Sequence, residues 1–205
     1  MSLILASSSP RRIQMFKDLG VPFKVIKPKV AEVQARGESA EEYVLRLSKD
    51  KAMAVADRSN EVKKKYVYIL AADTTVIVGK RILEKPKSKN DALRMLKTLS
   101  GRTHQVATAF SWLRVGKDSQ VLVSEVLKTN VRFAKRSESF WKWYVATGEP
   151  MDKAGAYAAQ GVGMSFVDAY EGSYANVVGL PLPQVIDCFL DNFGQKALEE
   201  NFPCF

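Results

Sequence analysis

Seven consecutive apolar residues, Tyr66 to Ala72, are the feature that most limits what this chain can fold into. An alternation of apolar and polar residues would indicate a strand with one face in water. An unbroken apolar run instead indicates a central strand that is covered on both faces, as in sheets flanked by helices. The run ends abruptly at Asp73, and residues 74–83 are predicted to form a hairpin around Gly79 and Lys80.

The start of the chain predicts a strand that feeds directly into a helix. Residues 3–6 are apolar, and Ser9 is a natural N-cap for a helix over residues 10–19. Free backbone N–H groups at such a helix start form an anion site. Arg11 and Arg12 carry the wrong charge for the first turn of a helix, which favours a bound anion such as a phosphate chain. These residues are equally consistent with a plain strand–turn–helix that carries two solvated arginines.

The rest of the chain alternates between helical and strand patterns. Capping residues and apolar periodicity predict helices from Ser39 through Val55, over 88–99, from Ser137 to about 147, and through 185–190 up to Gly194. Strands are expected at 23–26, 103–115 and 120–133, with two short strands around Gly172. The two long strand segments favour an antiparallel pair, so the fold class is mixed α/β.

Composition narrows the class of protein. A chain of 205 residues with 46% apolar content can form one sizeable domain or two small lobes. The net charge of +9 suits nucleic acid, an acidic membrane surface or a small polyanion. Apart from residues 63–65 and the lysines at 85, 87 and 89, the basic residues are scattered, which argues against a nucleic-acid groove. Cys188 and Cys204 are too few for a disulfide framework, and no signal or membrane-spanning segment is evident, so a soluble intracellular protein is expected.

Asp73 is the strongest single candidate for chemistry. A carboxylate after a buried strand is costly unless it lies at an exposed strand end or meets a cation. It could be a metal ligand or a general base, but taken alone its position slightly favours a structural turn aspartate. Lys85, between Glu84 and Pro86, could reach a phosphate or could be an ordinary surface lysine. His104, the only histidine, lies in a strand pattern and is interpreted as structural.

The chain also resembles a known family in ordered blocks that run over nearly its whole length. The matching blocks are Leu5-Ala6-Ser7-Ser8-Ser9-Pro10-Arg11-Arg12, Ala72-Asp73-Thr74, Glu84-Lys85-Pro86, Ser100-Gly101-Arg102-Thr103-His104, Asp152-Lys153-Ala154-Gly155-Ala156-Tyr157, Gln160-Gly161 and Val178-Gly179-Leu180-Pro181-Leu182. Together they resemble the Maf-like nucleotide pyrophosphatases. The resemblance implies a single domain over residues 1–205 with an elongated, partly antiparallel central sheet flanked by helices. This fold is similar to that of inosine triphosphate pyrophosphatases, with two lobes around a cleft.

The activity implied by the resemblance is hydrolysis of nucleoside triphosphates to the monophosphate and pyrophosphate. Asp73 would be the proton acceptor, assisted by Glu32 and Lys51 as further catalytic residues. Ser7, Arg12, Lys51 and Lys85 would hold the phosphates. Asp73 and Glu32 would hold a divalent metal, and their hard oxygen ligands favour Mg²⁺ or Mn²⁺ over zinc.

The family has at least two substrate branches, one taking dTTP and UTP and the other preferring 7-methyl-GTP. Arg11, Thr74 and Gln160 match the pyrimidine branch, and the tryptophan that the other branch inserts before the arginine pair is absent. Ala71 stands where the pyrimidine branch often has glycine. The resemblance therefore implies a dTTP and UTP pyrophosphatase, with modified pyrimidine nucleotides as further substrates.

The same resemblance implies a cytoplasmic homodimer that binds a nucleoside triphosphate and neither nucleic acid nor membrane. Two alternatives come from other classes of protein. One is a nucleotide-sensing regulator without turnover, which fits the family's link to septum formation and cell-division arrest. The other is a basic nucleic-acid-binding module, whose affinity would fall steeply with salt.

Overall fold

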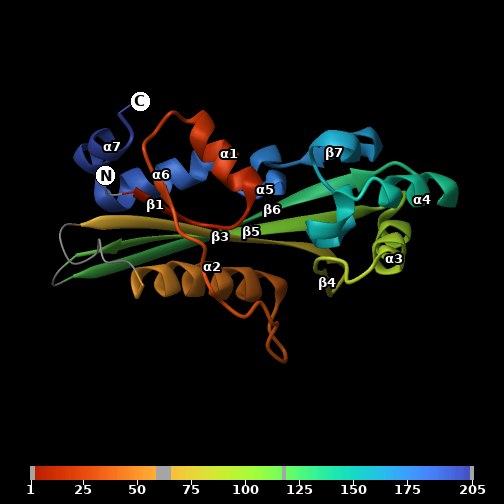
Figure 1. Ribbon diagram of the computed structural model, residues 1–205, viewed down its shortest axis with the longest axis horizontal. Helices are drawn as coiled ribbons and strands as arrows, with labels where there is room; N and C mark the ends of the chain where they lie inside the picture. The colour runs from red at the N-terminus through yellow and green to blue at the C-terminus, as the bar shows by residue number, and fades with distance from the viewer. Residues whose placement is uncertain (1–2, 59–65, 117–118, 204–205) are drawn as a thin grey trace. The chain divides into compact units, whose positions relative to one another are not determined.

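The computed structural model describes residues 3–58, 66–116 and 119–203 (Figure 1). The chain forms two compact units. The first unit comprises Met1–Asp73, Thr108–Val126 and Gly179–Phe205. The second comprises Thr74–Ala107 and Leu127–Val178. Each unit therefore combines segments that are far apart in the sequence.

A mixed sheet runs through the described residues in the order β2-β1-β3-β5-β6-β7, with β4 paired to β3. Its strands are β1 (Leu3–Ala6), β2 (Lys24–Val25), β3 (Val67–Val78), β4 (Arg81–Leu83), β5 (Thr103–Val115), β6 (Gln120–Phe133) and β7 (Val167–Glu171). Strand β1 is parallel to β2 and β3, whereas the β3/β4 and β6/β7 pairs are antiparallel. The mixed α/β class with a partly antiparallel sheet is thus confirmed.

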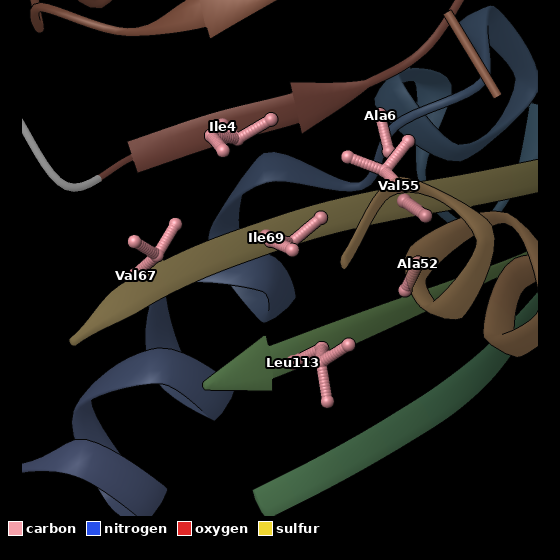
Figure 2. Packing of buried hydrophobic residues seen from close by; sticks show 8 residues of the cluster. Ile4, Ala6, Ala52, Val55, Val67, Ile69 and Leu113 are labelled. Carbon is pink, nitrogen blue, oxygen red and sulfur yellow. The ribbon is translucent and has the colours of Figure 1, made fainter. Parts of the chain in front are cut away.

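Helix α2 (Ala40–Ala56) covers one face of the sheet in the first unit (Figure 2). The packed side chains are small or β-branched for the most part: Ile4, Ala6, Ala52, Val55, Val67, Ile69, Ala71 and Leu113. Alternate residues of a strand share a face, so Val67, Ile69 and Ala71 all point toward α2. The same alternation places the side chain of Asp73 on the α2 face.

Aromatic residues fill the opposite face of the first unit. Helix α6 (Leu182–Phe193) packs there, with the Phe189 ring 4.9 Å from both the Tyr68 ring and the Trp112 ring. Trp112 also donates its indole N–H to the Val185 carbonyl oxygen at 2.8 Å. Helices α1 (Pro10–Asp18) and α7 (Gln195–Asn201) complete the helices of this unit. With α2 on one face and α6 on the other, β3 is covered on both sides, as its apolar run predicted.

The second unit has an aromatic core of its own. Its helices are α3 (Lys89–Leu99), α4 (Glu138–Ala146) and α5 (Tyr174–Val178), with short 3₁₀ turns η2 (Glu149–Asp152), η3 (Ala154–Ala156) and η4 (Gly161–Phe166). The Phe166 ring lies 4.9 Å from the Trp141 ring, 4.8 Å from the Tyr144 ring and 5.1 Å from the Phe133 ring. Phe166 therefore joins α4 to the end of β6.

Helix starts were the most accurate local predictions. The side chains of Ser9, Ser39, Ser88 and Ser137 each accept the predicted cap hydrogen bond. At Ser39 the full capping box forms, because Glu42 reaches back to the cap N–H at 2.8 Å. The two long strands at 103–115 and 120–133 have the predicted bounds.

Three local predictions were wrong. Strand β3 does not end at Asp73: the predicted hairpin over residues 74–83 is present, with β4 as its second strand, but its first strand is the continuation of β3. The second short strand expected after Gly172 is helix α5, and α7 was not predicted at all. The strand at 23–26 shortens to Lys24–Val25.

No helix in the described ranges combines the length and the apolar character that a membrane crossing needs. Cys188 is a buried free cysteine on α6. Residues 63–65 and Cys204 lie outside the part of the chain that the structure describes.

Candidate active site

The turn between β1 and α1 is closed by its own serines. The buried Ser7 accepts a hydrogen bond from the Ser9 N–H at 3.1 Å, and the Ser9 hydroxyl in turn accepts from the Arg12 N–H at 3.5 Å. Arg11 is half-buried in the first turn of the helix. The predicted strand-to-helix connection is therefore present, with Ser7, Arg11 and Arg12 all at its start.

Arg12 is buried and its guanidinium is fixed by backbone carbonyls. Its Nε donates to the Gly179 carbonyl oxygen at 2.7 Å, and its Nη1 donates to the Ala72 carbonyl oxygen at 2.8 Å. Burial lowers the pKa of the guanidinium, and the nearby Asp73 carboxylate partly offsets this effect. The alternative of a solvated arginine is wrong for Arg12, which ties α1 to the residue just before Asp73.

Asp73 lies just beyond the end of the neighbouring parallel strand. The β1–β3 pairing stops at Ala6 and Ala71, so β1 no longer flanks β3 at Asp73. The Asp73 Oδ1 atom is 2.6 Å from the Lys51 Nζ atom, which comes from α2 on the same face. Asp73, which was predicted to lie at a strand end, thus lies within β3, next to the end of β1.

Lys51 joins two carboxylates at one point. Its Nζ atom lies 2.6 Å from Glu32 Oε1 as well as 2.6 Å from Asp73 Oδ1. The Lys51 and Asp73 side chains are only 8% and 11% exposed, whereas Glu32 is 43% exposed. The structure therefore brings together all three residues that the resemblance assigned to catalysis.

The electrostatics of this cluster centre on Asp73. Burial raises the pKa of the Asp73 carboxyl above its usual range, while the Lys51 and Arg12 charges act to lower it. A carboxylate whose pKa is raised binds a proton, or a cation in its place, more readily than one in water. Such perturbed groups are frequent at functional sites.

The donor set fits a hard divalent cation that takes some of its ligands from the protein and the others from a bound substrate. No group of three or more His, Cys, Asp or Glu residues in the described ranges is arranged to hold a metal ion by itself. The two carboxylates that meet at Lys51 are oxygen donors. Mg²⁺ and ions like it are typically held by one or two carboxylates, with substrate phosphates and water as the other ligands.

The remaining predicted site residues belong to the second unit. Thr74 follows Asp73 in β3 and is half-buried. Lys85 is exposed just after β4, and the adjacent Glu84 carbonyl oxygen accepts the Gly155 N–H at 3.1 Å. Gln160 is exposed at the start of η4.

The sequence did not predict the residues that hold the segment after Gln160 and the segment that carries Glu32. The Glu149 carboxylate accepts N–H bonds from Val162 at 3.0 Å and Gly163 at 2.9 Å, just after Gln160. In the first unit, Arg46 donates to the Val33 carbonyl oxygen at 3.0 Å, in the segment that carries Glu32. Neither residue belongs to a matched block, and the four-residue spacing from Arg46 to Asp50 indicates only an ordinary helix-surface pair.

His104 has the structural role that the sequence indicated. It is buried, and its Nε2 lies 2.9 Å from the Tyr157 hydroxyl. Burial lowers the pKa of His104 to about 4, so the ring is neutral at neutral pH.

Known proteins resemble this chain along most of its length. The family model described as "Maf-like protein" matches residues 2–191. A dTTP/UTP pyrophosphatase of Anaeromyxobacter sp. (strain Fw109-5) is 46% identical over 186 residues, which cover 90% of this chain and 86% of the relative. A dTTP/UTP pyrophosphatase of Shigella sonnei is 44% identical over 200 residues, covering 97% of this chain and 95% of the relative. Among solved structures, the Ham1 protein of Staphylococcus aureus matches with a TM-score of 0.36 at 20% identity, over 63% of this chain and 71% of that one.

Proposed function

Since this chain belongs to the Maf-like protein family, we propose that it is a nucleoside triphosphate pyrophosphatase that acts on dTTP and UTP. It releases pyrophosphate and leaves the nucleoside monophosphate. Modified pyrimidine nucleotides are proposed as further substrates.

The observation that carries this proposal is the meeting of Asp73 and Glu32 at one lysine ammonium. Both carboxylates lie 2.6 Å from Lys51 Nζ. Arg12 is a second buried cation, and it donates to the carbonyl oxygen of Ala72, the residue just before Asp73. Hydrolysis of a phosphoanhydride needs cations around the phosphates and a base that orients water. This cluster contains both kinds of group.

Each side chain has a distinct proposed task. Asp73 accepts a proton from the attacking water at one carboxylate oxygen, and Lys51 holds that carboxylate in place. Arg12 and Ser7, at the start of α1, bind phosphate oxygens, as do backbone N–H groups at a helix N-terminus. Lys85 contributes a further positive charge to the phosphates.

Asp73 and Glu32 would hold a divalent metal, with Mg²⁺ or Mn²⁺ as the ions that suit their oxygen donors. When bound, such an ion neutralises charge on the phosphate oxygens. Lys51, whose Nζ lies 2.6 Å from an oxygen of each carboxylate, would also supply positive charge to the phosphates.

The proposal includes the setting in which the protein works. The chain acts as one domain over residues 1–205, as a homodimer in the cytoplasm, and it binds neither nucleic acid nor membrane. Analytical ultracentrifugation with and without a DNA duplex tests the dimer and the absence of nucleic-acid binding together.

A screen of the common nucleoside triphosphates tests the activity. Pyrophosphate and monophosphate should appear in equal amounts from dTTP and UTP, and EDTA should abolish both products. Accumulation of the nucleoside diphosphate would show that a different phosphorus atom is attacked. Tight nucleotide binding without product would favour the sensing regulator.

A further inference from the structure

Glu32 lies in a segment that has no helix or strand of its own. Between β2 and α2 the chain is irregular, and residues 31–37 are exposed. The contact from Lys51 holds only the end of the Glu32 side chain. A 43% exposed carboxylate on an irregular segment needs a second anchor if it is to keep one position.

Arg46 supplies that anchor from the same helix that carries Lys51. Its Nη2 donates to the Val33 carbonyl oxygen at 3.0 Å, on the residue next to Glu32. Its Nε and Nη2 donate to the two oxygens of Glu38, at 2.6 and 2.8 Å. This two-pronged geometry is specific to arginine, because the planar guanidinium matches a carboxylate and lysine has only a point charge.

Glu38 closes the segment on itself. Its Oε2 atom also accepts the Ala35 N–H at 2.8 Å, and its carbonyl oxygen accepts from the Gln34 side chain at 2.7 Å. The Glu38 side chain is only 9% exposed although its neighbours are open to solvent. The hydrogen bond from Arg46 lowers the pKa of Glu38, so this carboxylate is charged at neutral pH.

Arg46 is itself fixed on α2. Its guanidinium carbon lies 5.6 Å from the centre of the Tyr43 ring, and its Nη1 is 3.4 Å from Asp50 Oδ2. The side chain is therefore oriented by its own helix before it contacts the segment at 32–38.

We propose that Arg46 and Glu38 form a clamp that positions Glu32, so that α2 holds the Glu32 segment at two points, Arg46 and Lys51. Arg46 and Glu38 are positioning residues that act through Glu32. The inference rests on the proposed function, because it gives the clamp a task in the pyrophosphatase reaction.

The first test measures turnover of dTTP in four proteins: wild type, Arg46→Gln, Glu32→Gln and the double variant. Loss of a residue that orients a metal-binding or catalytic group typically costs 10–100-fold in activity or metal affinity. Arg46→Gln should lower kcat about tenfold with a KM for dTTP within about threefold of wild type. It should also weaken Mn²⁺ binding to the protein, followed by electron paramagnetic resonance of the free ion. In the Glu32→Gln background, Arg46→Gln should cause no further loss.

The second test needs no activity. Exchange of the Ala35 amide hydrogen should be faster in Arg46→Gln than in wild type, because the amide's acceptor, Glu38, loses its anchor. Arg46→Lys should restore neither the slow exchange nor the turnover. Lys97→Gln is a matched control, since Lys97 forms a 2.7 Å ion pair with Glu138 in the second unit and should change neither quantity.

Several outcomes would overturn the clamp. They are a wild-type kcat in Arg46→Gln or Glu32→Gln, an equal loss from Arg46→Gln in both backgrounds, and unchanged exchange at Ala35. If wild type releases no pyrophosphate from any nucleotide, the proposed function fails by itself. The exchange and Mn²⁺ measurements then still decide whether Arg46 holds the Glu32 segment.

Discussion

The two units of this protein differ in the polar groups that they bury. Both bury neutral groups, such as the hydroxyls of Ser48 and Ser111 in the first unit, but among the described residues only the first unit buries charged side chains. The first unit buries charges, with Lys51 and Asp73 in contact at 2.6 Å and Arg12 held against two carbonyls. The second unit buries neutral groups: Asn176 donates to the Val106 carbonyl oxygen at 3.1 Å and to Thr129 Oγ1 at 2.8 Å. Its His104 is neutral as well.

The difference shows which polar groups the fold needs and which it tolerates. A neutral amide with matched partners can stabilise a core, whereas a buried ion pair often contributes little or costs stability. Burial raises the pKa of Asp73, so ionisation of this group lowers the free energy of unfolding as pH rises. The charges of the first unit are therefore best explained by chemistry, and the neutral groups of the second by architecture.

The largest expected effect comes from Asp73→Asn. The change removes the proposed base, so turnover of dTTP should fall by roughly 10²–10⁴-fold. The fold should persist, because Lys51 keeps its 2.6 Å contact to Glu32. Steady-state kinetics combined with thermal unfolding would measure both quantities.

Asp91→Asn is the control for that change. Asp91 lies in the second unit, where it accepts from the Lys87 N–H and from Arg94 at the start of α3. Its loss should leave turnover unchanged. Near-normal turnover in Asp73→Asn would contradict the assignment of the base and the contrast between the units.

His104 gives the next largest effect, on stability alone. Burial lowers its pKa from 6.5 to about 4, so the unfolded chain binds a proton more readily than the folded one. The free energy of unfolding should fall as pH decreases from about 6.5 to about 4, by about 3 kcal/mol at about 1.4 kcal/mol per pKa unit.

Chemical denaturation at a series of pH values would measure this dependence. In His104→Gln the part of the slope that belongs to His104 should disappear, although the variant is less stable at pH 7. An unchanged slope would mean that other groups cause the acid sensitivity.

Asn176→Ala tests the neutral side of the comparison directly. The change leaves the Val106 carbonyl and the Thr129 hydroxyl without the amide donor, and a buried group without its partner costs about 1–3 kcal/mol. We expect about 2 kcal/mol less stability, with the dTTP turnover of the remaining folded protein unchanged. If the fully folded Asn176→Ala variant showed a fall in kcat larger than tenfold, Asn176 would have a role in the reaction as well as in the stability of the second unit.

The sequence predicted the features that depend on local signals and missed those that depend on tertiary contacts. Local signals determined the helix starts, since Ser39 and Ser137 need only their own next three residues to form a cap. The apolar run before Asp73 predicted a strand covered on both faces. It could not show that this strand and the first strand of the predicted hairpin are one continuous strand, because that depends on how β3 pairs with both β1 and β4.

The site was predictable in its members and not in its contacts. A matched block named Asp73, and the family resemblance named Lys51 and Glu32 by their position, yet no pattern along the chain shows that one ammonium joins both carboxylates. That contact depends on the packing of α2 against β3, which is set by tertiary structure. Arg46 and Glu149 were missed for the same reason, because each acts on backbone groups of a distant segment.

The smallest expected effect concerns substrate selectivity, and it tests whether polar residues of the second unit bind the base or only stabilise the fold. Gln160 is exposed, at the start of a segment whose next amides are bound by Glu149. A glutamine amide can donate and accept at once, which suits the edge of a uracil or thymine ring. Thr74 follows Asp73 in β3, so its side chain lies on the other face of the strand, and its hydroxyl is the second polar group proposed to contact the ligand. Gln160 and Thr74 are therefore the two residues of the second unit that are proposed to read the base.

Gln160→Ala should therefore reduce the ratio of kcat/KM for dTTP to that for GTP by about tenfold, because a lost hydrogen-bond partner costs about 1–3 kcal/mol. Thr74→Ala should shift the same ratio, since its hydroxyl is proposed to contact the same ligand. Arg11 also matches the pyrimidine branch, and Arg11→Lys should show whether a planar fork is needed there. Lys142→Gln, at an exposed position on α4, is the control and should leave the ratio unchanged. If the ratio is the same in wild type, Gln160→Ala and Thr74→Ala, neither Gln160 nor Thr74 reads the base.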